Sequence, residues 1–166
     1  VARLAQLKHI VAIKEASGSL EQMSRILQLT GRRLALLSGD DALTLPVLAI
    51  GGTGVISVVA NLVPQDVAAM IRAFEQGKLS QAAEWHHRLM PLVRAMFVET
   101  NPIPVKTAMG FLGMIDPALR LPLCALSPAN LEKLKVALEA YGLRKQSGKL
   151  KVESGKPTSK KRSLKV

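Results

Sequence analysis

Residues 10–18 have the sequence Ile-Val-Ala-Ile-Lys-Glu-Ala-Ser-Gly, and this segment decides the fold class. Its first four residues are apolar and three are β-branched, a pattern typical of a strand buried on both faces of a parallel sheet. Lys14 follows at the carboxyl end of that strand, where parallel α/β folds carry their chemistry. Apolar surroundings would favour its neutral amine, which attacks carbonyl carbon. The alternative is a lysine that extends into solvent with only its stem buried.

The same order of strand, turn and helix is repeated downstream. Ser19 and Gln22 fit a capping box. Apolar periodicity and turn residues predict a helix over 20–30, a strand over 34–37, a helix over 41–49 and a strand over 54–58. Three β-then-α units with short connections require right-handed crossovers and a parallel sheet. We therefore expect an α/β fold.

Beyond the third strand the pattern becomes purely helical, with helices predicted near 64–76, 78–96, 102–112 and 128–141. The chain thus divides into a β/α part over 1–76, a helical region over 77–143 and a basic tail over 144–166. Residues 1–7 carry apolar side chains at helical spacing, typical of the last two turns of an amphipathic helix. A chain that opens inside a helix, without Met, is expected to be the carboxyl-terminal part of a longer protein.

The net charge of +11 is concentrated in the tail. Residues 144–166 hold nine Lys or Arg and one acidic residue, Glu153, whereas residues 1–143 hold fourteen Lys or Arg and eleven Asp or Glu. A tail rich in Lys, Ser, Gly and Pro cannot bury enough apolar surface to order itself, so we expect disorder. Weak attraction to RNA, DNA or an acidic surface is its alternative role. The near balance elsewhere argues against nucleic acid as the partner of the folded part.

Composition narrows the class of protein further. The 166 residues are 48% hydrophobic but only 3% aromatic, which suits helices packed on a parallel sheet better than an antiparallel sandwich. No apolar stretch approaches the roughly 20 residues that span a bilayer, and no signal segment opens the sequence. Cys124 is the single cysteine, so no disulfide framework is possible and a cytoplasmic protein is expected.

Three strand ends carry polar or glycine-rich turns, at residues 14–18, 38–41 and 56–61. In a parallel sheet or barrel these turns share one rim, so an amine, glycine space and the carboxylates of Asp40 and Asp41 could meet there. The two aspartates could equally cap a helix.

Two other motifs carry less chemistry. Residues 51–54, Gly-Gly-Thr-Gly, lack the ending of a phosphate loop and precede a strand, so we predict a tight turn. His86 and His87 are neighbours on a helix that point in different directions, and no third ligand stands at metal spacing. We therefore expect no metal site there.

Four segments, in order, resemble the dihydrodipicolinate synthase family: residues 10–18, Leu-Ser-Gly-Asp-Asp at 37–41, Gly-Gly-Thr-Gly-Val-Ile-Ser-Val at 51–58 and Asn-Pro-Ile-Pro-Val-Lys at 101–106. The resemblance covers about residues 1–143, and the basic tail has no counterpart in it. It implies that residues 1–76 are the last three β/α units of a (β/α)8 TIM barrel, followed by a carboxyl-terminal helical region.

The resemblance also implies a function, that of a lyase that condenses pyruvate with L-aspartate 4-semialdehyde toward diaminopimelate and lysine. Lys14 would form a Schiff base with pyruvate, Ile56 would line the pyruvate site, and Gly39 would give close access to the substrate. Because lysine itself supplies the covalent chemistry, neither a metal nor an organic cofactor is implied. The complete protein would be a homo-oligomer, a tetramer or dimer, without a membrane partner.

The sequence also departs from the family pattern. The proton-relaying tyrosine, the arginine for the substrate carboxylate and the pyruvate-binding threonine of the family lie on earlier strands absent here, and Tyr141, in the last helix, is no replacement. Residues 1–166 alone are therefore expected to have little or no activity, and their open sheet edges to favour aggregation. The nearest alternative function is another Schiff-base lyase of the superfamily, sialate lyase or a sugar-acid aldolase. A noncatalytic fragment whose basic tail attracts nucleic acid is the alternative from a different class.

Overall fold

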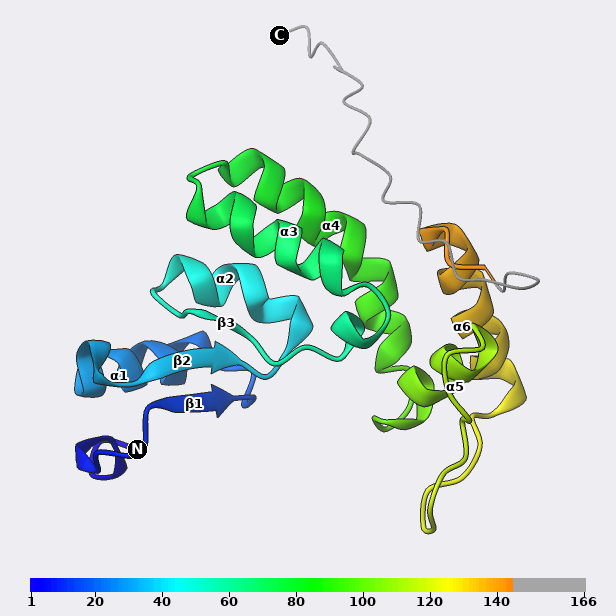
Figure 1. The fold of residues 1–166 in the computed structure, drawn as a ribbon, viewed down its shortest axis with the longest axis horizontal. Helices are drawn as coiled ribbons and strands as arrows, with labels where there is room; N and C mark the ends of the chain where they lie inside the picture. The colour runs from blue at the N-terminus through cyan, green and yellow to red at the C-terminus, as the bar shows by residue number, and fades with distance from the viewer. Residues whose placement is uncertain (145–166) are drawn as a thin grey trace, which may run out of the picture.

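The structure, a computed structural model, describes residues 1–144 and contains a parallel three-stranded sheet. The strands are β1 (Ala12–Glu15), β2 (Ala35–Ser38) and β3 (Gly54–Val55), in that order across the sheet. Helices α1 (Leu20–Thr30) and α2 (Thr44–Ala49) connect them and pack against one face of the sheet (Figure 1). The predicted α/β fold with a parallel sheet is confirmed.

The helix α1 forms where the capping pattern predicts it. Ser19 is its N-cap, and the Ser19 hydroxyl accepts a hydrogen bond of 3.1 Å from the Gln22 amide. Met23 and Ile26 lie on its buried side, against Leu36 of β2. Gly31, at φ +56°, ends the helix in a backbone conformation that side chains disfavour. The sequence therefore sets both ends of this helix and its buried face.

The carboxyl-terminal half is helical, as predicted. It contains α3 (Pro64–Glu75), α4 (Leu79–Met96), α5 (Ile103–Phe111) and α6 (Pro128–Tyr141). Helices α3 and α4 lie side by side, and α5 and α6 lie at the end of the molecule away from the amino terminus (Figure 1). These helices share one core with the segment after β3. The largest fully buried side chains of this core are Met70, Leu92, Met96, Leu134 and Leu138.

Short 3-10 helices complete the described chain: Leu4–Gln6, Gly31–Arg33, Asp41–Leu43 and Val59–Asn61. The first of them corrects a prediction, because residues 1–7 do not form the last two turns of an α-helix. Val1, Leu4 and Leu7 are about half exposed, at 49%, 54% and 55%. A short amphipathic segment gains most of its helical stability from tertiary packing, and these side chains have little of it here.

The first strand is less buried than its sequence predicts. Ala12 and Lys14, which alternate onto the same face of β1, are both exposed. The reason is that β1 is an edge strand of the described sheet and only its α1 side is covered, where Ile13 packs against the α1–α2 core. The prediction of a strand buried on both faces is therefore wrong for the described structure.

The third strand is also shorter than the predicted 54–58. The Ile56 amide still donates to the Ser38 carbonyl at 2.8 Å, which continues the pairing with β2. The Val58 amide, which would be the next to extend it, instead donates to the carboxylate of Asp41 at 2.8 Å, and the Val59 amide donates to the same carboxylate at 3.3 Å. A buried side chain thus ends the strand, and the chain turns into the 3-10 helix Val59–Asn61.

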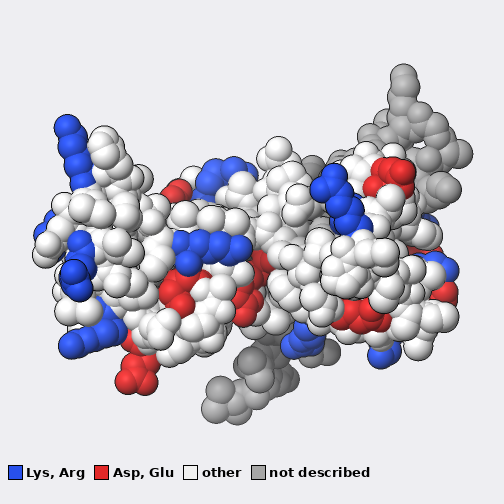
Figure 2. Space-filling view, turned by 90° about the horizontal axis from the view of Figure 1, so that it is seen from below, with Lys and Arg blue, Asp and Glu red and all other residues white. Residues whose placement is uncertain are grey.

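The described chain contains no helix long and apolar enough to cross a membrane. Most of the face shown in Figure 2 is uncharged, and both Lys or Arg and Asp or Glu side chains form scattered patches on it. This agrees with the near balance of charge counted over residues 1–143. The prediction that the tail is disordered concerns residues 144–166, and residues 145–166 lie outside the described part of the chain.

Glu99 fastens the start of α6 to the end of α4. Its carboxylate accepts hydrogen bonds from the Ser127 hydroxyl (2.7 Å), the Asn130 amide group (2.8 Å) and the Ser127 backbone amide (3.1 Å). These hydrogen bonds, that of Asn130 foremost, lower the pKa of Glu99 below its ordinary value of 4.5. Ser127 is the N-cap residue of α6, and its hydroxyl is engaged by Glu99 rather than capping the helix.

We predict that Glu99→Gln makes stability less dependent on pH in the acid range. A carboxyl whose pKa is lowered on folding contributes stability that is fully present above its unfolded pKa and lost as the pH falls through its folded pKa. The measurement is the urea midpoint of the complete protein as the pH is lowered from 6 to 3. The midpoint of Glu99→Gln should fall less steeply below pH 4.5 than that of the wild type, and Asn130→Ala should show the same trend more weakly. Equal slopes for all three proteins would contradict the assignment.

Candidate active site

The carboxyl ends of the three strands meet at one edge of the sheet. In the parallel register Lys14 is opposite Leu37, and Leu37 is opposite Gly54. Side chains alternate between the faces of a strand. Gly39 comes two residues after Leu37, and Ile56 comes two residues after Gly54, so both lie on the same face as Lys14. The amide bonds from Gly39 to the Glu15 carbonyl (2.7 Å) and from Ile56 to the Ser38 carbonyl (2.8 Å) extend the pairing to both positions.

Lys14 and Gly39 are in close contact. A Cβ atom added at Gly39 would lie 2.9 Å from Lys14 Cε, 2.5 Å from Ala16 Cβ and 3.1 Å from the Glu15 carbonyl oxygen. Real Cβ atoms essentially never approach other atoms to less than 3.0 Å. The stem of Lys14 therefore passes across Gly39, and a side chain at residue 39 would meet both this stem and the short side chain of Ala16.

The face that carries these residues is open in the described structure. Lys14 is exposed, and Ile56 is 47% exposed. The expectation of apolar surroundings around the amine is therefore not met, because α1 and α2 cover only the opposite face of the sheet. The residue that the resemblance assigns to the pyruvate site, Ile56, does lie on the same face as the lysine.

Asp40 and Asp41 have structural partners. Asp40 is the N-cap of the 3-10 helix Asp41–Leu43, and its carboxylate accepts from the Ala42 amide at 2.8 Å. Asp41 is 6% exposed, and its carboxylate accepts hydrogen bonds from the amides of Val58 and Val59. Asp40 therefore caps a short helix, one of the two roles that the sequence allows, and Asp41 ties the β2 turn to the turn after β3.

Sequence reasoning missed Glu15. It is 6% exposed, and its carboxylate accepts three hydrogen bonds, from the Ser17 amide, the Ser17 hydroxyl and the Gln22 side chain. The burial of Glu15 could have been predicted from the alternation of side chains along a strand. Glu15 follows Ile13 by two residues, so its side chain shares the α1-facing side of the strand. A carboxylate in that place needs donors, and Ser17 and Gln22 are near enough in sequence to supply them.

The fourth motif, at 101–106, packs the helical region. Ile103, Pro104 and Val105 are buried at the start of α5. The Lys106 ammonium donates a hydrogen bond to the Ala118 carbonyl and so holds the loop that follows α5.

Tyr141 and the histidine pair also have packing roles. The hydroxyl of Tyr141 donates to the Asp66 carboxylate at 2.6 Å, which joins α6 to α3. Burial, followed by that hydrogen bond, raises the pKa of Tyr141. His86 and His87 are edge-to-face, with ring centroids 5.4 Å apart, and burial, followed by the neighbouring His87, lowers the pKa of His86.

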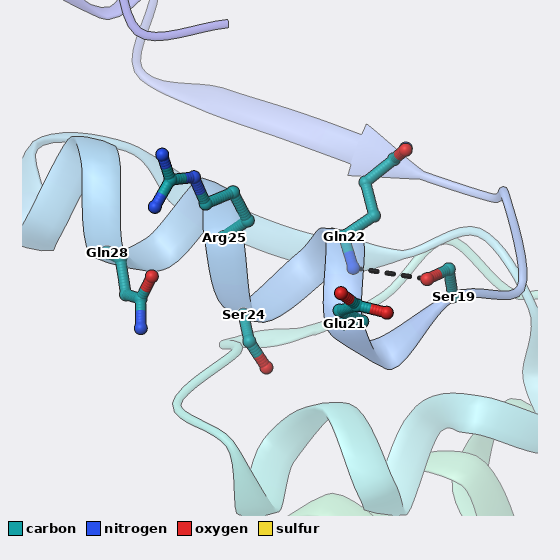
Figure 3. Close-up of a pocket in the computed structure, with 6 residues that line it drawn as sticks. All are labelled: Ser19, Glu21, Gln22, Ser24, Arg25 and Gln28. Atoms are coloured by element: carbon teal, nitrogen blue, oxygen red, sulfur yellow. Dashed lines mark hydrogen bonds between the residues drawn. The ribbon is translucent and has the colours of Figure 1, made fainter.

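A polar groove runs along the outward side of α1 (Figure 3). It is lined by Ser19, Glu21, Gln22, Ser24, Arg25 and Gln28. None of the three residues predicted from the sequence for the substrate site lines it. The groove adjoins the strand-end turn only through Gln22, which donates to Glu15 at 2.9 Å.

Comparison with known proteins gives a family for these features. The model of the dihydrodipicolinate synthetase family matches residues 1–141. The chain is 59% identical over 139 residues to the 4-hydroxy-tetrahydrodipicolinate synthase of Methanothrix thermoacetophila, covering 83% of this chain and 47% of that protein. It is 51% identical over 143 residues to the 4-hydroxy-tetrahydrodipicolinate synthase of Geotalea daltonii, covering 86% of this chain and 49% of that protein.

Solved structures agree with the sequence relatives. Dihydrodipicolinate synthase from Aquifex aeolicus superposes with a TM-score of 0.85 at 44% identity, over 88% of this chain and 50% of that one. Dihydrodipicolinate synthase from Thermotoga maritima superposes with a TM-score of 0.82 at 42% identity, over 86% of this chain and 50% of that one. The chain thus spans about half the length of the curated relatives and of the solved structures that it matches, and its sheet and helices correspond to the carboxyl-terminal part of their TIM barrel.

Proposed function

The chain belongs to the dihydrodipicolinate synthetase family, and on that basis we propose that the complete protein that contains it is a 4-hydroxy-tetrahydrodipicolinate synthase. Its relatives with that name share 59% and 51% identity with it. Their reaction class is that of a lyase. The proposed substrates are pyruvate and L-aspartate 4-semialdehyde, and the proposed setting is lysine and diaminopimelate biosynthesis in the cytoplasm.

The proposed chemistry starts at Lys14. Its neutral amine adds to the ketone carbon of pyruvate, water leaves, and a protonated imine remains. The imine withdraws electrons, so the methyl carbon loses a proton and forms an enamine. The enamine carbon attacks the aldehyde carbon of aspartate semialdehyde, and the aldehyde oxygen takes up a proton. Attack of the semialdehyde amine on the imine carbon closes the ring and releases Lys14 as the free amine.

The observation that carries this proposal is the contact of Lys14 with Gly39 at the carboxyl end of the parallel sheet. The lysine stem lies where a Cβ at residue 39 would collide with it, and Ile56 stands on the same face. In parallel α/β folds this rim is the usual place for catalysis. We propose that Gly39 leaves room for substrate beside the amine and that Ile56 contributes an apolar wall to the pyruvate site.

We propose the division of the chain into a barrel part over 1–76, a helical region over 77–143 and a basic tail over 144–166. The barrel part contributes α3 and the segment after β3 to the core of the helical region, because α3 packs against α4, whereas α1, α2 and the sheet form a separate core. We also propose that the complete protein is a homo-oligomer, as a dimer or tetramer.

The test is a comparison of substrates with the complete protein. With pyruvate present, it should consume aspartate semialdehyde, and its cleavage of sialic acid should be slower by about 10³-fold or more, since a site built to pair with the polar groups of one substrate has those site groups left unpaired by another. Faster cleavage of sialic acid or of a sugar acid would replace the proposal by the corresponding aldolase.

Residues 1–166 alone are predicted to have little or no synthase activity. In the described sheet β1 and β3 are edge strands, and unpaired strand edges favour aggregation. The face with Lys14 is open to water, so the amine has no enclosed site. A continuous assay of the isolated polypeptide, with the complete protein as control, measures this. Turnover close to that of the complete protein would refute the prediction.

A further inference from the structure

Glu15 is a charged residue that the fold buries directly beside Lys14 in sequence. It is the last residue of β1 and is 6% exposed. Neighbouring residues of a strand point to opposite faces, so its side chain turns toward α1 while that of Lys14 lies on the open face. The Glu15 carboxylate therefore belongs to the support of the site and not to the surface that a substrate would meet.

The carboxylate of Glu15 holds the β1–α1 connection in place. One oxygen, Oε1, accepts from the Ser17 amide at 3.0 Å and from the Gln22 side chain at 2.9 Å. The other, Oε2, accepts from the Ser17 hydroxyl at 3.0 Å. Figure 3 shows the Gln22 side chain extending from the first turn of α1 toward the end of β1. Glu15 thus fixes both the turn and the start of the helix to the strand end.

The backbone of Glu15 reaches the other side of the candidate site. Its carbonyl oxygen accepts from the Gly39 amide at 2.7 Å, and it is opposite Ser38 in the register. The Cβ position of Gly39 is in turn 2.9 Å from Lys14 Cε. A shift of the Glu15 backbone therefore moves Lys14 directly and Gly39 through this hydrogen bond.

We propose that Glu15 is a positioning residue for Lys14, whose carboxylate fixes the end of β1 so that the lysine stem stays across Gly39. This inference rests on the proposed function, in which Lys14 is the imine-forming amine. Covalent attack needs the nitrogen within near-attack distance of the carbonyl carbon, and a misplacement of about 1 Å can cost about 10²-fold in rate. Glu15 would act on that geometry without touching the substrate.

The test is the rate at which cyanoborohydride traps pyruvate on Lys14 of the complete protein, divided by the folded fraction. Glu15→Ala removes all three carboxylate hydrogen bonds, so trapping should slow by about 10-fold to 100-fold. Glu15→Gln should trap at close to the wild-type rate. Its amide oxygen can accept from Ser17 and Gln22 in place of Oε1, and its amide group can donate to the Ser17 hydroxyl.

Asp66→Ala is the matched control. Asp66 is also a buried carboxylate, 7% exposed, but its hydrogen bond from Tyr141 joins α3 to α6. Its loss should lower stability and leave the trapping rate per folded molecule unchanged. A purely structural role of Glu15 would give the two alanine variants the same rate, which would overturn the proposal, as would wild-type trapping by Glu15→Ala.

If Glu15→Ala does not fold, Gln22→Ala replaces it as the test variant, because Gln22 is exposed and donates one of the three hydrogen bonds to Glu15. Gln22→Ala should slow trapping severalfold. A wild-type trapping rate in Gln22→Ala would overturn the proposal. If the wild-type protein forms no adduct at Lys14, the proposed function itself fails, and the role of Glu15 fails with it. An adduct at Lys14 that forms equally fast in Glu15→Ala defeats only the role of Glu15.

Discussion

Replacing Lys14 by alanine is expected to abolish condensation of pyruvate with aspartate semialdehyde, with a loss in kcat of at least about 10³-fold. The physical reason is that removal of a covalent nucleophile leaves only substrate binding and orientation to accelerate the reaction. Lys14→Arg keeps a long stem and a positive charge but offers no amine that forms an imine at neutral pH, so it should be as inactive as alanine. The measurement is steady-state turnover of the complete protein.

Lys8→Ala provides the matched control for that experiment. Lys8 is an exposed lysine six residues before Lys14 and lies outside the strand. Its removal should leave turnover within about twofold of the wild type, as is usual for surface substitutions. Substantial activity in Lys14→Arg would mean that charge, and not the nucleophile, is what residue 14 supplies, and the proposed chemistry would be wrong.

Gly39→Ala is expected to have the second-largest effect. The new methyl carbon would lie 2.5 Å from Ala16 Cβ and 2.9 Å from Lys14 Cε. The lysine stem can swing away, but the short Ala16 side chain cannot, so the backbone at the end of β1 must shift. We expect a loss of about 10²-fold in the rate of imine trapping at Lys14, with a destabilisation of about 1–3 kcal/mol from overpacking.

Gly77→Ala separates the two effects of that substitution. Gly77 lies in the turn between α3 and α4 at φ +71°, and a Cβ there meets no atom within 4 Å. The strained backbone should cost about 1 kcal/mol, while imine trapping per folded molecule stays at the wild-type rate. If Gly39→Ala also traps at the wild-type rate, the contact between Gly39 and Lys14 has no part in placing the amine.

Features that depend on local sequence were predictable. The capping residue Ser19 and the terminating Gly31 define α1, and both lie where the sequence predicts them. The parallel order of the strands follows from the short β–α connections and is confirmed by the register of Lys14 with Leu37. These features depend on residues that are close to one another in the chain.

The features that sequence reasoning did not reach depend on contacts between distant segments. The early end of β3 results from Asp41, which takes the amides of Val58 and Val59, 17 and 18 residues away. The exposure of Lys14 depends on which face of β1 is covered, and apolar composition alone does not determine that. Of the candidate site, the grouping of Lys14, Gly39 and Ile56 follows from strand alternation, whereas the burial of Glu15 required α1 to be in place.

The most direct measurement is borohydride reduction of the complete protein in the presence of pyruvate, followed by mass spectrometry of its peptides. One reduced pyruvate adduct per chain is expected, on the peptide that contains Lys14 and on the amine of that residue. Addition of aspartate semialdehyde before the reductant should lower the yield, because the enamine is consumed. An adduct on another lysine, or no adduct, would show that Lys14 is not the imine-forming residue.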